Sequence, residues 1–443
     1  MRILIFGINY APELTGIGKY TGEMAAWLAS QGHDMTAVTG LPYYPEWEIH
    51  DGYKKKWWVK ERIDHVNIYR CPLYVPRKVT AVKRIIHEFT FLLGMLPVWL
   101  MLLFGRKYDL VLCVSPPFHM SILPLIYAKI RGVKLVTHIQ DLQVDAARDL
   151  GMIKNKRGLD LMFKVEKMIF DASSAISTIS PGMQRKIMAK NISPSKIIQF
   201  PNWVDESVIN PMQKIHSLRN EFGIDQDAKV ILYSGNLGEK QGLEVIVDVA
   251  KSFENQKDVV FVIVGCGGGK EKLENLVKES GLSNILFFPL QPYDKLAPLL
   301  AMADLHLVLQ KQSASDLVMP SKLSAILAIG GCPIVTAIPG TSLYDIVFKH
   351  RMGILIKPEC ADSLKEGIEL ALKTDLTEYS TNARRYAEQF LSKEKVLRHV
   401  EASLEELIGK SSTPAQAVHE KQPERIEKVQ ALSQPAFKIA EKI

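Results

Sequence analysis

Residues 229 to 242 read KVILYSGNLGEKQG, and this stretch determines how the rest of the chain is interpreted. Its first six residues, rich in Val, Ile, Leu and Tyr, predict a short buried β-strand. The strand runs directly into a loop with three glycines, and a helical pattern follows the loop. A strand that leads through glycines into a helix is the first half of a βαβ unit, so the stretch predicts a parallel sheet.

The same alternation of strand-like and helix-like segments fills both halves of the chain. In the first half, the expected strands are residues 2–6, 35–39, 110–115, 134–138 and 174–177. In the second half they are residues 229–234, 259–264, 285–289 and 305–309. The pattern predicts an α/β fold with two Rossmann-like, doubly wound domains that face a cleft. Their expected bounds are 1–200 and 201–385, followed by a C-terminal helix at 386–410 and a flexible polar tail at 411–443.

Positive charge and apolar residues are concentrated next to each other in the first half. The net charge is +7, and residues 53–84 contain ten Lys or Arg against two acids. Residues 89–105 then run without a charge, but they are short for a bilayer crossing and contain Pro97. A buried helix and an interfacial membrane segment both remain open for this stretch. With Trp57, Trp58 and Trp99 nearby, we expect peripheral attachment to an anionic membrane and no nucleic acid.

Two features indicate a cytoplasmic protein. The N-terminus begins with a predicted strand that meets Gly7, and it lacks the apolar core and cleavage site of a signal peptide. The five cysteines include no Cys-x-x-Cys pair, which is typical of reduced thiols. Together with the membrane prediction, this indicates a cytoplasmic protein that is peripheral on an anionic membrane surface.

Two glycine loops exclude familiar nucleotide sites. The first contains Gly16, Gly18 and Lys19, but Thr21 stands where a dinucleotide fingerprint needs its third glycine. The loop from Gly265 through Gly267 to residue 270 lacks the Ser or Thr that a P-loop requires after its lysine, so ATPase activity is excluded. Backbone without side chains can still approach a phosphate, a ribose or a base, and we expect both loops to bind a nucleotide.

The strongest candidates for a phosphate site lie in the second half. The loop Gly235–Gly242 offers Lys240 as a cation and includes Asn236, and a polar loop containing Asp316 precedes a short helix. A helix N-terminus with unpaired amides attracts anions. The expected contributors at this helix are the amides of Leu317, Val318 and Met319 and the side chains of Ser321, Lys322 and Ser324.

Polar residues at the ends of the first-half strands are candidates for contacting an acceptor hydroxyl. His119, His138 and Asp141 lie at or after the carboxyl ends of predicted strands, where ligand-binding groups collect in parallel sheets. Each residue taken alone is more often a packing or capping residue. Asp225 and Asp227 resemble a metal motif, but they precede a strand and thus lie at the opposite edge, so a solvated turn is expected. The sequence predicts no metal site and no cofactor.

These residues together resemble the retaining GT-B glycosyltransferases of family four over residues 1 to 400. The matching motifs are Thr15-Gly16-Ile17-Gly18, Pro201-Asn202-Trp203-Val204-Asp205, the loop with Gly235, Leu237, Lys240 and Gly242, and Val264-Gly265-Cys266-Gly267. The family's Glu-x7-Glu element falls on Asp316 and Ser324. In that family the first acid contacts the donor sugar and the second contacts the ribose, so Asp316 is implied to bind the sugar.

The resemblance implies a metal-independent transfer of a sugar from a nucleotide-diphosphate donor. A narrower similarity to exopolysaccharide biosynthesis enzymes implies fucose from GDP-fucose, and an acceptor saccharide linked to a lipid diphosphate. Lys240 and Asp316 are the implied catalytic pair, and Asn202 is implied to bind the donor. Two alternatives stay open: a nucleotide-sugar 2-epimerase on the same scaffold, and a non-catalytic membrane scaffold of a polysaccharide assembly complex.

Overall fold

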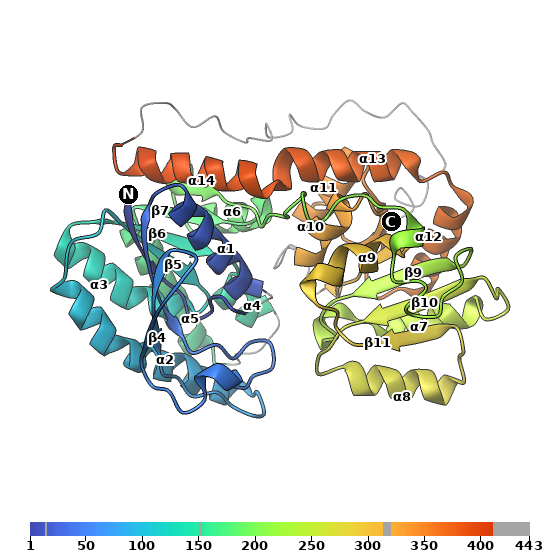
Figure 1. The fold of residues 1–443 in the computed structure, drawn as a ribbon, viewed down its shortest axis with the longest axis horizontal. Coiled ribbons are helices and arrows are strands. Elements are labelled where there is room, and N and C mark those ends of the chain that lie inside the picture. The colour runs from blue at the N-terminus through green and yellow to red at the C-terminus, as the bar shows by residue number, and fades with distance from the viewer. Residues whose placement is uncertain (14–15, 150–152, 154, 313–319, 411–443) are drawn as a thin grey trace. The chain divides into compact units, whose positions relative to one another are not determined.

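The computed structural model divides into two compact α/β units and describes residues 1–13, 16–149, 153, 155–312 and 320–410 (Figure 1). The first unit runs from Met1 to Pro201 and includes a C-terminal segment that begins at Val396. The second unit runs from Asn202 to Lys395. The expected donor contacts of Asp316, Leu317, Val318 and Met319, and the tail from residue 411, lie outside the described residues.

The first unit is built on an eight-stranded sheet in the order β3-β4-β2-β1-β5-β6-β7-β8. Its strands pair in parallel, except that β3 runs antiparallel to β4. The strand bounds are β1 Arg2–Phe6, β2 Asp34–Gly40, β3 Val59–Ile63, β4 Val66–Cys71, β5 Leu110–Ser115, β6 Lys134–Ile139, β7 Ala175–Thr178 and β8 Ile197–Gln199. The central β5 is buried along its whole length, as expected for a parallel strand that is covered on both faces.

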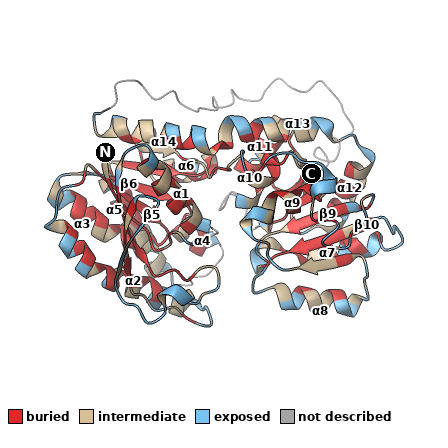
Figure 2. Ribbon diagram, in the orientation of Figure 1, coloured by how far each residue is buried: buried red, intermediate tan, exposed pale blue. Residues whose placement is uncertain are grey.

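Helices follow most strands of this unit and cover the sheet (Figure 2). Their bounds are α1 Gly16–Ser30, α2 Ala81–Leu103, α3 Ile122–Arg131, α4 Gln143–Asp149, α5 Lys156–Ala172, α6 Pro181–Met188 and α14 Lys393–Leu407. Local sequence explains several of the ends. Thr80 caps α2 by accepting a hydrogen bond from the Lys83 amide, and Gly132 ends α3 in the left-handed conformation.

The second unit repeats the plan with a six-stranded parallel sheet in the order β11-β10-β9-β12-β13-β14. The strands are β9 Lys229–Ser234, β10 Val259–Val264, β11 Ile285–Phe288, β12 Leu305–Val308, β13 Pro333–Thr336 and β14 Ile354–Ile356. The helices are α7 Glu244–Ser252, α8 Lys270–Ser280, α9 Leu296–Ala301, α10 Ser321–Ala328, α11 Ser342–His350, α12 Ala361–Lys373 and α13 Thr377–Tyr386. The prediction of two doubly wound α/β domains is thus confirmed.

Each sheet has one point where the strand order reverses. In the first unit the chain goes from β1 outward through β2 and then returns to β5 on the other side of β1. In the second unit it goes from β9 to β10 and β11 and then returns to β12 on the other side of β9. Ligands of doubly wound proteins bind outside the carboxyl ends of the strands at such a reversal. The fold therefore marks the ends of β1 and β5 and the ends of β9 and β12 as places to look for function.

Helix α2, which contains most of the uncharged stretch at residues 89–105, is buried on one side and exposed on the other. The buried side corresponds to the interpretation as a core helix, and the exposed side to the interpretation as an interfacial segment. Phe91, Met95 and Trp99 are among its residues that pack into the first unit's core against β1 and β5. The exposed side is also apolar, and Val82–Leu103 is long and apolar enough to cross a membrane by length and composition alone. A helix whose buried face belongs to a globular core is anchored to that core, so the exposed face is the part that needs an explanation.

A buried arginine holds together the entry to the second sheet. Arg219 has no exposed surface, and its guanidinium donates to the carbonyls of Met302, Gln226 and Ala228 at 2.7–2.9 Å. It also donates to Asp304 Oδ2 at 2.9 Å, and that oxygen accepts the Val230 amide at 2.9 Å. Burial alone would raise the pKa of the Asp304 carboxyl, but these hydrogen bonds and the nearby positive charges lower it. The network ties the loop before β9 to the start of β12.

We expect Arg219→Leu to lower the free energy of unfolding by about 3–5 kcal/mol, because it removes the buried charge that faces the Asp304 carboxylate and leaves buried carbonyls of Met302 and Ala228 without this donor. Lys214→Met is the matched control. Lys214 pairs with the same Asp304 carboxylate from an exposed position, so its loss should cost at most about 1 kcal/mol. Urea unfolding followed by circular dichroism measures both changes. Equal losses for the two variants would contradict the role given to Arg219.

Candidate active site

The carboxyl ends of β9 and β10 carry two glycine loops that hydrogen-bond to each other. The Gly235 amide donates to Val264 O at 2.9 Å, and the Leu237 amide donates to Cys266 O at 2.8 Å. The Gly269 amide returns the contact to Leu237 O at 2.8 Å. The two loops that the sequence predicted separately therefore form one surface at the reversal point of the second sheet.

Close backbone approach explains two of the glycines. A Cβ atom on Gly265 would lie 1.9 Å from Gly235 O, and one on Gly267 would lie 2.6 Å from Leu237 O. Both glycines also have positive φ angles, +159° and +150°. The sequence explained these residues by a nearby ligand, whereas the contact between the loops is already a sufficient reason for them.

The side chain of Lys322 reaches this surface from the first turn of α10. Its Nζ lies 3.5 Å from the centroid of the Tyr233 ring, and it has no hydrogen-bond partner among the described residues. A Cβ atom on Gly235 would lie 3.2 Å from that Nζ. The stem of Lys322 is partly exposed but its Nζ is shielded from solvent, and this burial lowers the pKa of the amine to about 7.

The remaining predicted donor residues of the second unit occupy the same edge or its vicinity. Lys240 is exposed in a short turn, Glu239–Gln241, and its carbonyl accepts the Lys311 amide at 2.8 Å. Asn236 is exposed, and its Oδ1 would lie 2.5 Å from a Cβ atom on Gly267. The sequence ranked Lys240 first among the cations, but the structure gives Lys322 the shielded position.

Residues around α10 and at the start of the second unit complete this set. Ser321 is exposed at the first position of α10, which follows Pro320 and has no side-chain cap. Ser324 is buried on the same helix. Asn202 opens the second unit, and its Oδ1 is buried without a hydrogen-bond partner among the described residues. The donor-binding roles of these residues stay predictions.

In the first unit, Glu13 organises the glycines at the reversal point between β1 and β5. Its buried carboxylate accepts hydrogen bonds from the amides of Tyr43 and Tyr44, both at 3.1 Å, and from Asn9 Nδ2 at 2.9 Å. Burial raises the pKa of Glu13, and these hydrogen bonds only partly oppose that shift. A Cβ atom on Gly18 would lie 2.5 Å from Glu13 Oε2, so the glycine makes room for the carboxylate.

The start of α1 presents its other predicted residues to different partners. Gly16 begins the helix with a φ of +60° and is exposed. Lys19 lies 3.7 Å from Glu23 Oε1, a spacing typical of a surface ion pair on one helix face. Glu13 is not distinguished by its sequence, because a lone acid between a strand and a helix is typical of an ordinary loop.

His138 is a core residue with both ring nitrogens engaged. Nδ1 lies 2.9 Å from Ser177 Oγ, and Nε2 accepts from Gln140 Nε2 at 2.8 Å. Burial lowers the pKa of His138 to about 3, so the ring is neutral at physiological pH. These contacts favour a packing role over contact with an acceptor.

His119 instead lies beside the carboxyl group of Glu88, which the sequence did not predict as a site residue. Its Nε2 has no hydrogen-bond partner among the described residues and lies 3.9 Å from Glu88 Oε2, while its ring stacks on Phe89 at 4.8 Å. Glu88 Oε1 accepts from Arg84 and Gln143, both at 3.3 Å.

Burial shifts both pKa values towards the neutral forms, lowering that of His119 to about 4 and raising that of Glu88. A neutral imidazole beside a carboxyl group can bind a hydroxyl. Glu88 was overlooked because it directly precedes the uncharged stretch and was not read as part of its helix. Asp141, the third predicted residue, follows β6 in the turn before α4.

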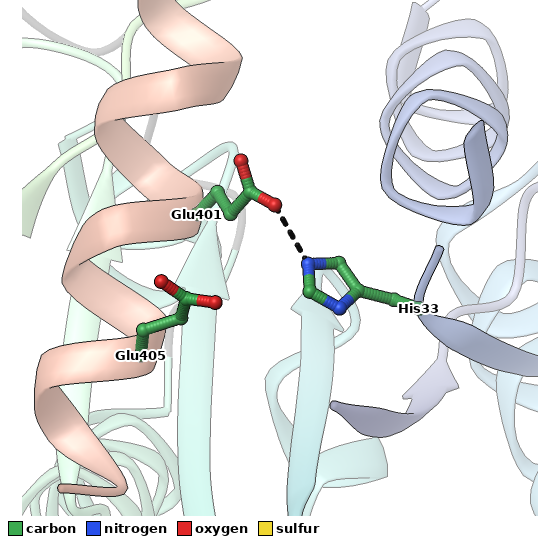
Figure 3. Close-up of side chains that lie close together, drawn as sticks. All are labelled: His33, Glu401 and Glu405. Atoms are coloured by element: carbon green, nitrogen blue, oxygen red, sulfur yellow. Dashed lines mark hydrogen bonds and ion pairs between the residues drawn. The ribbon is translucent and has the colours of Figure 1, made fainter. Parts of the chain in front are cut away.

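One further cluster has the composition of a metal site (Figure 3). His33, Glu401 and Glu405 offer ligand atoms within 4.8 Å of one another. However, His33 Nε2 already lies 2.7 Å from Glu401 Oε1, and its Nδ1 lies 2.9 Å from the Met1 amine. Both ring nitrogens are thus in use, and we interpret the cluster as the contact that fixes α14 to the first unit.

Comparison with protein families matches both units. Residues 15–203 match the model described as glycosyl transferase 4-like domain. Residues 214–390 match the model described as glycosyl transferases group 1. Each match covers most of one unit.

Individual relatives show this similarity over about nine tenths of the chain. WcaI of Escherichia coli K12, named as a colanic acid biosynthesis glycosyl transferase, is 40% identical over 406 residues, which are 90% of this chain and 98% of the relative. Sucrose-phosphate synthase of Thermosynechococcus elongatus has a similar fold, with a TM-score of 0.72 at 16% identity over 93% of this chain and 100% of that one. HepE of Anabaena, solved with UDP-glucose, has a TM-score of 0.68 at 14% identity over 92% of this chain and 100% of that one.

We expect Gly265→Ala to disrupt the surface formed by the two loops, because its Cβ atom would collide with the Gly235 carbonyl. Binding of nucleoside diphosphates should weaken at least about tenfold, and the protein should lose about 1–3 kcal/mol of stability. Gly268→Ala is the matched control, since no atom lies within 4 Å of its added Cβ. Calorimetric titration with UDP and GDP and thermal unfolding measure both effects, and equal behaviour of the two variants would refute this packing argument.

Proposed function

Because this chain belongs to the GT-B glycosyltransferases of family four, we propose that it transfers a sugar, with retained configuration, from a nucleotide diphosphate to a lipid-diphosphate-linked saccharide. The similarity to WcaI supports a place in the synthesis of a colanic-acid-type exopolysaccharide. GDP-fucose is the proposed donor. UDP sugars belong in the test as well, because the HepE structure contains UDP-glucose.

In the proposed mechanism the second unit holds the donor and the first unit holds the acceptor. Cations and amides at the glycine loops stabilise the departing diphosphate as the sugar becomes cation-like, which is charge stabilisation in the transition state. The acceptor hydroxyl then attacks from the side of the leaving group, and its proton passes to a diphosphate oxygen. The neutral His119 ring and the neighbouring Glu88 carboxyl group are the proposed contacts for that hydroxyl.

The observation that carries the lipid-linked acceptor is the exposed apolar face of α2. The face and the residue that follows it consist of Val82, Ile85, Ile86, Phe89, Leu93, Leu100, Met101 and Phe104. Leu93 is 63% exposed and Phe104 is 84% exposed, values that are unusual for side chains of this size in a water-soluble protein. Phe89 stacks on His119, so the apolar face extends to the proposed acceptor contact.

Aromatic and basic residues flank this face as they do in peripheral membrane proteins. Trp58 is half exposed, and its Nε1 donates to Gly94 O of α2 at 2.8 Å, which places the Trp57–Trp58 pair beside the helix. Exposed basic side chains lie close to both helix ends along the chain, namely Arg77, Lys78, Arg84, Arg106 and Lys107, and Lys55 and Lys56 precede the tryptophan pair. Apolar burial combined with attraction to anionic lipid gives reversible binding, so we propose attachment to the inner face of a bacterial inner membrane.

The double variant Leu93→Glu with Phe104→Glu should reduce sedimentation with phosphatidylglycerol vesicles at least about tenfold, since each exposed apolar side chain contributes roughly 1–2 kcal/mol when it enters lipid. Ile215→Glu with Leu290→Glu is the matched control, because these residues are exposed and apolar but belong to the second unit and not to the face of α2. Wild-type protein should bind phosphatidylcholine vesicles much more weakly. If the α2 variant sediments like the wild type, this face does not bind membranes.

Lys240→Ala should lower turnover by about a hundredfold, the typical effect of losing one donor to a developing negative charge. A thermal-shift screen against GDP, UDP and their sugars first identifies the donor, and product analysis with an extracted lipid-linked acceptor then measures transfer.

Interconversion of the donor sugar without acceptor would instead establish the epimerase alternative. Failure to bind any nucleotide sugar would favour the non-catalytic scaffold.

A further inference from the structure

The amine of Lys322 lies where a ligand is expected, and none of the described residues accepts a hydrogen bond from it. It projects from α10 to the carboxyl end of β9, at the reversal point of the second sheet. Its neighbours there are the face of the Tyr233 ring and the Gly235 backbone. The Tyr233 hydroxyl donates to Asn236 O at 2.7 Å, so the tyrosine offers the amine its ring face.

This arrangement is unfavourable for a lysine in the absence of a ligand. An ammonium group carries three N–H donors, and buried donors without acceptors cost free energy. The Nζ of Lys322 is shielded from solvent and has no hydrogen-bond partner among the described residues. Contact with an aromatic face compensates a cation only in part.

The charged groups on neighbouring segments are engaged elsewhere. Glu239 lies 3.9 Å from Lys311 Nζ and 4.0 Å from Lys272 Nζ. Glu359 Oε2 accepts the Gln312 amide at 3.1 Å. On β9, burial raises the pKa of the Tyr233 phenol, so this residue stays neutral. Lys240 lies on the loop that follows β9 and carries the same charge as a protonated Lys322.

We propose that Lys322 is the group that receives the diphosphate of the donor, and that it takes up a proton as the diphosphate binds. The inference rests on the proposed function, and it assigns the main diphosphate contact to Lys322 and couples binding to the uptake of a proton. A diphosphate oxygen supplies the acceptor that the amine lacks and stabilises its charged form. Burial holds the pKa of the free amine at about 7, so near neutral pH a substantial fraction must gain a proton on binding.

The affinity for the donor should change with pH in a defined direction. Below the pKa of the free amine the group is already charged, and donor affinity should be constant. Above it the free protein must gain a proton to bind, so affinity should fall about tenfold between about pH 6 and pH 8. The diphosphate of a nucleotide sugar has no group that titrates in this range, so the ligand itself adds no such change.

The same burial predicts the opposite trend for the stability of the unliganded protein. The pKa of Lys322 is lower in the folded than in the unfolded state, so the unfolded chain binds more protons above about pH 7. The buried Lys322 amine therefore lowers the free energy of unfolding most at pH values at and below its pKa in the folded state. This destabilisation decreases as pH rises towards the pKa of the amine in the unfolded state. Lys322→Met should leave the fold as stable as the wild type or more stable at neutral pH, whereas a structural lysine would leave a destabilised variant.

The experiment is calorimetric titration of the full chain with GDP-fucose and UDP-glucose in two buffers of different ionisation enthalpy. At pH 8 the buffers should reveal uptake of about 0.9 proton per donor bound, and at pH 6 about 0.1. Lys322→Met should weaken binding about 10- to 100-fold, as expected for the loss of a charged hydrogen bond, and should abolish the uptake. Lys278→Met, an exposed lysine on α8, should change neither property.

Each outcome separates this inference from the proposed function. Wild-type binding without proton uptake, or unchanged binding by a folded Lys322→Met variant, would overturn the role of Lys322 and leave glycosyl transfer intact. If the wild type binds neither donor, the proposed function itself is wrong. If the variant fails to fold, the proton uptake of the wild type still decides the matter, and Lys322→Arg, which stays charged, should bind without pH dependence.

Discussion

The contact between the glycine loops after β9 and β10 determines the geometry of the second unit's ligand edge. Because Gly265 carries no side chain, the Gly235 carbonyl can approach its backbone, and the loops join through hydrogen bonds on both sides of that contact. This fixes the backbone of Gly235 in a conformation with a φ of +141°. The absence of a Cβ atom on Gly235 in turn leaves space for the amine of Lys322. One close backbone approach thus positions both the amides and the cation of the proposed donor site.

The sequence predicted the fold well where strands are buried on both faces. β5 and β10 are continuous apolar runs, and such runs identify central parallel strands. The sequence did not predict β3 and β4, the last two strands at one edge of the first sheet. β3 reads Val-Lys-Glu-Arg-Ile, and its charged residues interrupt the apolar pattern that would identify a strand. The start of α2 was missed for a related reason, since it lies within the basic segment.

The candidate site was less accessible to prediction, because sequence shows charge but not burial. The sequence alone does not distinguish Lys240 from Lys322 as a cation. The packing shows that Lys240 is exposed and that the Nζ of Lys322 is shielded from solvent. His119 and His138 likewise differ in their contacts. Both ring nitrogens of His138 have hydrogen-bond partners, whereas Nε2 of His119 has none among the described residues. Glu88 became visible when the structure placed it beside His119. These distinctions arise from tertiary contacts between segments that are distant along the chain.

The apolar outer side of α2 has a consequence for how the protein behaves at high concentration in plain buffer. Two copies can shield this side from water by associating through it, and such association would increase with protein concentration by mass action. Under the proposed membrane attachment, lipid would compete for the same side of α2, so the available bilayer area would control how much of the protein remains self-associated.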